Sequence, residues 1–238
     1  MYENIKLVAM DLDGTLTQHK TPLEEKHRER LEALGKKYKL LMVGAGQVMR
    51  IFNQLEGFPI DIIGNYGMQY GEYKDGKMRI VRDDIVDCDR EKTTEIINKM
   101  REKYGFTEYR GECVEFHPSG CVTFPILGTK ALQEDKLAFD PDRQKRRKIY
   151  PEVVEAFLDY FVFVGGSSSF DMAPRPYNKY YALDRYCKEH GFSHEEVVYI
   201  GDDYGMGGND ESVYSSDFNY ITIDNYTQFC EKTECLLK

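Results

Sequence analysis

The sequence predicts an α/β protein: a doubly wound parallel sheet with a smaller α+β module inserted into it. At both ends of the 238-residue chain, short apolar runs that end in polar or glycine-rich turns alternate with amphipathic stretches. This alternation is typical of parallel strands joined by helices. From about residue 87 to residue 171, hairpin signals replace it, which indicates a module of a different kind.

The composition limits the class of partner. A net charge of −9 argues against nucleic acid or an anionic membrane, although a metal ion would still admit an anionic substrate. The six cysteines form no Cys-x-x-Cys pair, and residues 1–10 are too short and too mixed for a signal peptide. No apolar run has the length of a membrane span. We therefore expect a cytoplasmic monomer or homodimer.

Residues 7–15 carry the main functional signal. The stretch begins as an apolar run, typical of a buried parallel strand, and ends in Asp11, Asp13 and Gly14. Side chains two positions apart on an extended chain point the same way, so both carboxylates are expected to face one ligand. Such a pair suits a hard cation, or a nucleophile with an acid/base partner. The alternative is an Asp-Gly turn with solvated acids.

A second predicted strand, residues 40–43, follows a predicted helix in the stretch 22–38. It ends in a turn made of Gly44, Ala45, Gly46 and Gln47. A helix with apolar residues at helical spacing begins at Val48. A glycine-rich turn before a helix exposes backbone N–H groups and favours an anion. The alternative is a tight turn without a ligand.

We expect the core to comprise residues 1–84 and 173–238, and the inserted module to comprise residues 85–172. A third strand (60–64) and a hairpin around residues 74–77 complete the first part of the core. The module should contain helices at 91–104 and 151–157, a solvated charge run at 140–147, and strands at 114–117, 121–124, 160–164 and 169–172. A two-proline linker at 172–176 leads back to the core, with helices at 180–191 and 226–237 and strands at 196–200 and 220–223.

The strand ends should converge. Asp202, Asp203 and Asp210 follow the strand at 196–200, and Lys179 begins a helix at the same edge of the sheet. Carboxylates and a lysine beside a glycine turn are the groups that phosphoryl transfer needs. We expect Mg²⁺ on Asp11, a nearby backbone carbonyl and Asp202. The alternatives are a surface lysine, and helix capping by the later aspartates.

Several motifs together resemble the haloacid dehalogenase superfamily of phosphotransferases. They are Asp-Leu-Asp-Gly-Thr-Leu-Thr at 11–17, the lysine after the linker, and Gly-Asp-Asp followed by Asn209-Asp210. The resemblance covers nearly the whole chain, and the inserted module resembles the type IIB cap of Cof-type sugar-phosphate phosphatases and eukaryotic-type phosphomannomutases. Specifically mutase-like stretches are residues 42–47, 114–116, 165–171 and 201–210.

The resemblance implies a role for each matching residue. Asp11 is the nucleophile that forms an aspartyl-phosphate, and Asp13 is the general acid and base. Lys179 neutralises the nucleophile and a phosphate oxygen. The metal site consists of Asp11, Asp13 and Asp202, supported by Asn209 and Asp210. The turn Gly44–Gln47 binds the phosphate, and Ser169 and Asp171 of the cap face a small phosphorylated metabolite.

Two departures from the family pattern favour a phosphatase. The glycine turn lacks the Ser or Thr hydroxyl that usually binds the transferring phosphate. His117 and Gly128 stand where the mutase cap has arginines. The residues that could replace them are Lys130, Arg143, Arg146 and Arg147. We therefore expect a Mg²⁺-dependent phosphatase acting on a sugar phosphate. The alternatives are a hexose-phosphate mutase of the phosphomannomutase kind and a non-catalytic binding module.

Overall fold

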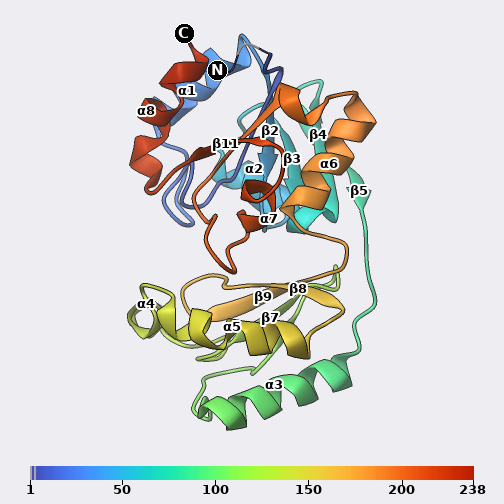
Figure 1. The fold of residues 1–238 in the computed structure, drawn as a ribbon, viewed down its shortest axis with the longest axis vertical. Helices are drawn as coiled ribbons and strands as arrows, with labels where there is room; N and C mark the ends of the chain where they lie inside the picture. Colours follow the sequence, from blue (N-terminus) through green and yellow to red (C-terminus); the bar gives the residue numbers. More distant parts are fainter. Residues whose placement is uncertain (1, 3) are drawn as a thin grey trace. The chain divides into compact units, whose positions relative to one another are not determined.

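The computed structural model describes residue 2 and residues 4–238, and they form two compact units (Figure 1). The first unit contains the chain up to Asp83 and the segments Asn178–Gly205 and Asp210–Lys238. The second unit contains Asp84–Tyr177 and Met206–Asn209.

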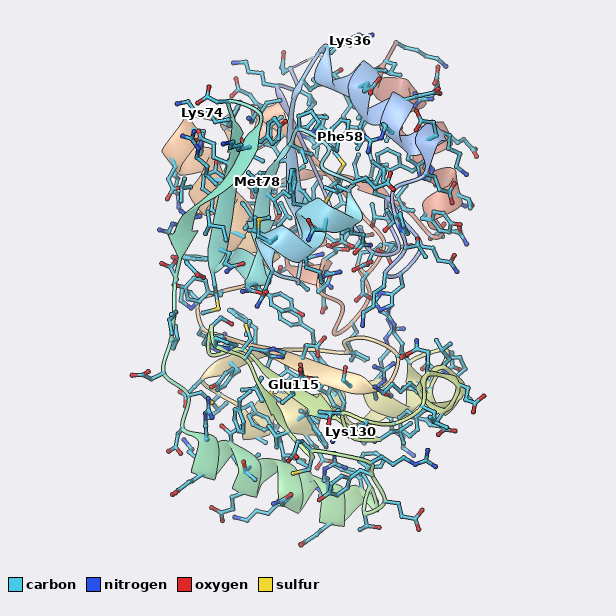
Figure 2. All side chains as sticks on the ribbon, turned by 180° about the vertical axis from the view of Figure 1, so that it is seen from behind. Lys36, Phe58, Lys74, Met78, Glu115 and Lys130 are labelled. Atoms are coloured by element: carbon cyan, nitrogen blue, oxygen red, sulfur yellow. The ribbon has the colours of Figure 1, made fainter. Side chains whose placement is uncertain are left out.

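The first unit is built on a seven-stranded sheet in the order β11-β10-β1-β2-β3-β4-β5. Its strands are β1 (Leu7–Met10), β2 (Lys39–Val43), β3 (Asp61–Gly64), β4 (Gln69–Lys74), β5 (Lys77–Asp83), β10 (Val197–Gly201) and β11 (Asn219–Thr222). The five strands from β11 to β3 are parallel, and the β4–β5 hairpin continues the sheet antiparallel. The hairpin turn at Lys74 is labelled in Figure 2. The expected α/β class with a largely parallel sheet is confirmed.

Helices cover both faces of this sheet. Its helical elements are α1 (Glu25–Gly35), α2 (Val48–Gln54), η1 (Asn65–Gly67), α6 (Lys179–His190), η2 (His194–Glu196), α7 (Glu211–Tyr214), η3 (Tyr226–Gln228), α8 (Phe229–Lys232) and η4 (Glu234–Leu236). Apolar residues of α1, α2 and α8 pack with Val8 and Met10 on one face. Those of α6 and α7 pack with Leu7 and Ala9 on the other, so the sheet is doubly wound. Among the helices of the described residues, none is long and apolar enough to cross a bilayer.

The second unit is an α+β module with an antiparallel sheet in the order β6-β7-β9-β8. Its elements are α3 (Arg90–Tyr104), β6 (Glu115–Phe116), β7 (Val122–Pro125), α4 (Gln133–Phe139), α5 (Gln144–Ala156), β8 (Tyr160–Phe163) and β9 (Ser169–Pro174). Val122, Phe124, Phe170 and Met172 pack against apolar residues of α3 and α5. Because side chains alternate along a strand, Thr123, Ser169 and Asp171 lie on the opposite face.

The boundaries between the units differ from the expected ones. The expected linker at 172–176 begins inside β9, because Met172, Ala173 and Pro174 are still paired with β8. The second unit therefore extends to Tyr177 rather than residue 172. The second unit also includes Met206–Asn209, where the carbonyl of Gly207 accepts the N–H of Val164 at 2.8 Å.

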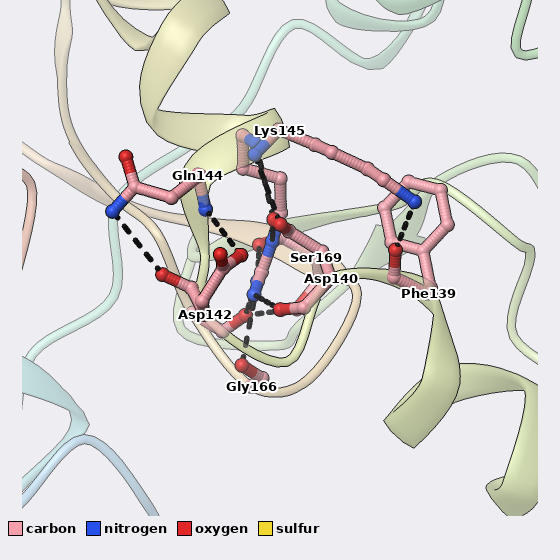
Figure 3. A network of polar contacts seen from close by, with 9 residues as sticks. Phe139, Asp140, Asp142, Gln144, Lys145, Gly166 and Ser169 are labelled. Atoms are coloured by element: carbon pink, nitrogen blue, oxygen red, sulfur yellow. Dashed lines mark hydrogen bonds and ion pairs between the residues drawn. The ribbon is translucent and has the colours of Figure 1, made fainter.

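The charge run at 140–147 is largely exposed, as the sequence predicts, except that Asp140 and Arg146 are buried. Arg146 is fully buried, and its Nε donates to Oδ2 of Asp140 at 2.8 Å. Its Nη1 donates to the carbonyls of Gly165, at 2.5 Å, and Ser169, at 2.9 Å, in the network of Figure 3. A buried guanidinium needs a counter-charge and acceptors, and both are supplied here. The last helix was expected to be continuous, whereas it is divided into η3, α8 and η4.

Candidate active site

The ends of β1 and β10 bring the first carboxylates together. The two strands are parallel neighbours, with Met10 opposite Ile200. Asp11 and Asp202 follow directly after these strands, and the N–H of Asp11 donates to the carbonyl of Ile200 at 2.9 Å. Gly14 lets the chain turn at φ +99°, and a Cβ at this position would overlap the carboxylate of Asp202. The glycine therefore permits the close approach of the two turns.

Lys179 lies between two carboxylates. It is the first residue of α6, where the side chain of Asn178 caps the helix by accepting from the N–H of Tyr181 at 2.8 Å. Its fully buried Nζ donates to Oδ1 of Asp11 at 2.7 Å and to Oδ1 of Asp210 at 2.8 Å. Burial alone would lower the pKa of Lys179, but the two carboxylates raise it above its ordinary value. The ammonium group therefore stays charged.

Asp11, Asp202 and Asp210 form an acidic cluster in which one oxygen of each lies within 4.8 Å of the others. Burial raises the pKa of Asp11 well above its usual range, although the positive charge of Lys179 acts to lower it. Burial and the charge of Asp210 raise the pKa of Asp202 to about 6. Gathering three acids around one lysine is unfavourable unless further positive charge is added.

Two of these three residues, Asp11 and Asp202, each keep one carboxylate oxygen that could bind a hard cation. Lys179 occupies Oδ1 of Asp11, and the hydroxyl of Thr15 occupies Oδ1 of Asp202. Among the described residues, neither Oδ2 has a hydrogen-bond donor. Asp210 differs, because its Oδ2 accepts the N–H of Asp203 at 3.0 Å and its Oδ1 accepts Lys179. Asp11 and Asp202 thus suit Mg²⁺, and Asp210 holds the lysine.

The carboxylate of Asp13 lies outside the acidic cluster of Asp11, Asp202 and Asp210. It accepts hydrogen bonds from Nε2 of Gln54 at 2.7 Å and from the N–H of Lys20 at 2.8 Å, and Arg50 lies 3.3 Å away. The reason is local: β1 ends at Met10, so strand alternation does not extend to residue 13. Burial alone would raise the pKa of Asp13, but these partners hold it below its ordinary value.

The glycine turn between β2 and α2 presents backbone N–H groups. The N–H of Gly44 is used by the carbonyl of Ile63 at 2.9 Å, and the N–H of Val48 by Oε1 of Gln69 at 3.0 Å. Within the described part of the chain, the N–H groups of Ala45, Gly46 and Gln47 have no hydrogen-bond acceptor. Three successive N–H groups without an acceptor can donate to an anion.

Ser169 and Asp171 are brought together on the second unit. The hydroxyl of Ser169 lies 3.4 Å from Oδ1 of Asp171, which also accepts the hydroxyl of Thr123 at 3.1 Å. Nε2 of His117 lies 3.0 Å from the same Thr123 hydroxyl. Burial raises the pKa of Asp171. This face of the sheet therefore carries a polar row able to bind hydroxyl groups.

The sequence predicts that Asn209 supports the metal site, which stays a prediction, and it does not indicate two other residues. Asn209 belongs to the segment Met206–Asn209 of the second unit. Tyr199, whose hydroxyl donates to Oδ1 of Asp210 at 2.7 Å, was not considered. Neither was Arg50, although it is the first cation after the glycine turn. A tyrosine inside an otherwise aliphatic strand just before Gly-Asp-Asp is a signal that points to a buried hydroxyl contact.

A cavity of about 530 Å³ lies elsewhere on the first unit. Its walls include Leu31, Lys36, Phe58 and Asp61. Leu31 and Lys36 belong to the end of α1, and Phe58 and Asp61 lie at the amino end of β3, away from the strand ends that carry the carboxylates. The cavity contains none of the sequence-predicted site residues.

The fold resembles that of several proteins of known structure. An IMP-nucleotidase of Plasmodium falciparum superimposes with a TM-score of 0.71 at 15% identity, covering 99% of this chain and 68% of that one. A haloacid dehalogenase-like hydrolase from Bacillus subtilis gives a TM-score of 0.61 at 18% identity, covering 92% and 89%. The fold is that of the haloacid dehalogenase superfamily.

Sequence comparison is more specific. The chain is 28% identical over 221 residues to the phosphomannomutase of Saccharomyces cerevisiae, covering 87% of this chain and 84% of the relative. It is 26% identical over 253 residues to the phosphomannomutase of Encephalitozoon cuniculi, covering 98% and 93%. A family model described as eukaryotic phosphomannomutase matches residues 27–234. The chain belongs to the eukaryotic phosphomannomutase family.

These relatives are mutases, whereas the main expectation from the sequence was a phosphatase. That expectation is supported only at the level of the superfamily, as an enzyme that acts on a phosphorylated substrate. The alternative, a phosphomannomutase-like mutase, agrees better with the family to which the chain belongs.

Proposed function

We propose that this protein is a hexose-phosphate mutase that moves a phosphoryl group between two positions of one sugar through an aspartyl-phosphate on Asp11. The observation that carries the proposal is the buried contact of Lys179 with Asp11 at 2.7 Å, at the carboxyl edge of the sheet. Membership of the phosphomannomutase family supports the choice of substrate and reaction.

Asp11 is the proposed nucleophile. Its carboxylate oxygen forms a bond to phosphorus while the bond from phosphorus to the sugar oxygen breaks. Lys179 holds the attacking carboxylate in one orientation and offsets negative charge as phosphate approaches. The donor in this step is a hexose 1,6-bisphosphate, which leaves as a hexose monophosphate. In the second half of the reaction, the free hydroxyl of a hexose monophosphate takes the phosphoryl group from Asp11, which regenerates a bisphosphate, so atoms and charge balance.

Mg²⁺ would be held by Asp11 and Asp202, through the carboxylate oxygens that have no donor among the described residues. When bound, the cation neutralises the phosphate and keeps both carboxylates ionised. The carboxylate of Asp13 is not part of this set, because it is turned toward Arg50 and Gln54. Asp210 supports the set by fixing Lys179.

The transferring phosphate would bind at the glycine turn without a side-chain hydroxyl. The N–H groups of Ala45, Gly46 and Gln47 supply donors directly. The guanidinium of Arg50 lies close enough to Gly46 that a Cβ there would overlap it. A bulkier residue in place of Gly46 would therefore shift the end of the flexible Arg50 side chain.

Asp13 would be the acid that gives a proton to the leaving sugar oxygen and the base that later removes one from the accepting hydroxyl. Its low pKa and its contact with Arg50 indicate that the carboxylate is ionised in the described conformation. It would act as an acid after leaving Arg50. Ser169 and Asp171 would bind sugar hydroxyls from the cap.

The test is a turnover assay with Mg²⁺ and either mannose 1-phosphate or glucose 1-phosphate, with and without the matching 1,6-bisphosphate. Phosphorus NMR follows the 6-phosphate and free phosphate in one sample. We expect the bisphosphate to activate isomerisation that exceeds phosphate release. Asp11→Ala serves as the control and should abolish both.

The second candidate is a phosphatase, which the cap favours. Gly128 has φ +84°, and a Cβ there would overlap the carbonyl of Arg110, so no side chain fits. Arg146 is occupied by Asp140 and backbone carbonyls, and Lys130 is exposed on the second unit (Figure 2). A mutase must hold a second phosphate, for which bidentate arginine is best suited. Phosphate release without the bisphosphate, exceeding isomerisation, would establish this candidate instead.

A further inference from the structure

Tyr199 occupies an unusual position in the core. It lies in the middle of β10, whose other residues are valines, an isoleucine and a glycine, and its side chain is fully buried. Its neighbour on β1 is Ala9, which leaves room for the large ring. A tyrosine in such a place needs a partner for its hydroxyl, since an unpaired buried hydroxyl is costly.

The partner is a carboxylate that the site depends on. The hydroxyl of Tyr199 donates to Oδ1 of Asp210 at 2.7 Å, and the same oxygen accepts Nζ of Lys179 at 2.8 Å. Burial and the charge of Asp210 raise the pKa of Tyr199 well above its usual range. The hydroxyl therefore remains protonated and acts as a constant donor.

The contacts form a line from the core to the nucleophile. Tyr199 donates to Asp210, Asp210 accepts Lys179, and Lys179 donates to Asp11 at 2.7 Å. The other oxygen of Asp210 is fixed by the N–H of Asp203. A carboxylate with donors on both oxygens has one orientation, and hydrogen bonds to charged groups are the stronger kind.

We infer that Tyr199 is a positioning residue, which fixes Asp210 so that Lys179 stays against Asp11. Without the hydroxyl, Oδ1 of Asp210 keeps Lys179 as its only donor, and the ammonium group shifts toward Asp210 and away from Asp11. The structural part of this inference stands alone. Its catalytic consequence rests on the proposed role of Asp11 as nucleophile.

The neighbouring strand offers a matched control. Tyr220 of β11 is the register partner of Tyr199, and the two ring centroids are 5.5 Å apart. The hydroxyl of Tyr220 is also buried, but it has no hydrogen-bond partner among the described residues. Tyr199→Phe and Tyr220→Phe thus remove the same atom from adjacent places, and only the first breaks a contact with Asp210.

The first arm of the test is structural and needs no activity. Crystal structures of both variants should show Lys179 beyond hydrogen-bond distance of Asp11 in Tyr199→Phe, and in place in Tyr220→Phe. The inference is overturned if Lys179 keeps both carboxylates in Tyr199→Phe. This arm tests the inference even if the wild-type protein transfers no phosphoryl group. A lack of phosphoryl transfer would contradict only the proposed function.

The second arm measures turnover. We expect Tyr199→Phe to lower kcat by about 10- to 100-fold, the range for a hydrogen bond to a charged group, with KM unchanged. Tyr220→Phe should keep the wild-type kcat. In an Asp210→Asn background, Tyr199→Phe should have little additional effect, because the hydroxyl acts through that carboxylate. Equal losses in both phenylalanine variants, or full additivity with Asp210→Asn, would contradict the positioning role.

Discussion

The hydroxyl of Thr15 donates a hydrogen bond to Oδ1 of Asp202 at 2.8 Å, although 187 positions separate the two residues. Thr15 is fully buried in the turn after β1, and Asp202 is in the turn after β10. The bond fixes the rotation of the Asp202 carboxylate and leaves its other oxygen available. Thr15 therefore orients a proposed Mg²⁺ ligand without touching the cation.

Thr15→Val should weaken Mg²⁺ binding about 10- to 100-fold, the usual effect of removing a hydrogen bond to a ligand. Valine keeps the shape and removes only the donor. Isothermal titration with MgCl₂ measures the change. Thr21→Val is the control, because the Thr21 hydroxyl bonds to the carbonyl of Gln18 at an exposed position. Equal Mg²⁺ affinities in the two variants would show that Thr15 does not orient the carboxylate of Asp202.

Lys179→Met should reduce the free energy of unfolding by about 3–5 kcal/mol in the absence of Mg²⁺. The variant leaves Asp11 and Asp210 buried without their shared cation. Urea denaturation at neutral pH measures the loss. Lys188→Met is the control: it also removes a lysine of α6 paired with an aspartate, but this lysine is exposed. A loss of less than 1 kcal/mol for Lys179→Met would mean that the buried contact contributes little.

The raised pKa of Asp202 predicts a specific pH dependence of stability. Between its ordinary value of 3.8 and about 6, the folded protein binds a proton that the unfolded chain releases. The protonated Asp202 therefore contributes to the free energy of unfolding at low pH, and this contribution decreases as pH rises through this window. In Asp202→Asn, which cannot titrate, that decline should be absent.

Thermal unfolding of both proteins without Mg²⁺, at several values between pH 4 and 6.5, measures the difference. Added Mg²⁺ should flatten the wild-type curve, because the cation favours the ionised carboxylate. Parallel curves for wild type and Asp202→Asn would show that the carboxyl titrates normally.

Part of this arrangement could be predicted from the sequence, and part could not. The convergence of Asp11, Asp202 and Lys179 follows from the rule that parallel strands end at one edge. The direction of Asp13 does not, because it depends on where β1 ends and how the following turn runs. The burial of Arg146 depends on Asp140 and three distant carbonyls, which no local pattern indicates. The roles in catalysis stay predictions.

Asp13→Asn separates acid catalysis from structural support. A carboxyl group that protonates the leaving oxygen typically contributes about 100- to 10,000-fold. We expect a loss of this size with sugar phosphates, whose leaving oxygens are strongly basic, and a much smaller loss with p-nitrophenyl phosphate. Steady-state rates on both substrates give the ratio. Equal losses would show that Asp13 serves only to hold Arg50 and Gln54.

The central claim is that Asp11 carries the phosphoryl group, and mass spectrometry tests it most directly. The protein is mixed with Mg²⁺ and a hexose bisphosphate, quenched within milliseconds, reduced with borohydride and digested, so that a phosphorylated aspartate is converted to homoserine. The account predicts homoserine at position 11, none at position 13, and no conversion when substrate is omitted. Turnover without modification at position 11, or homoserine at another aspartate, would contradict it.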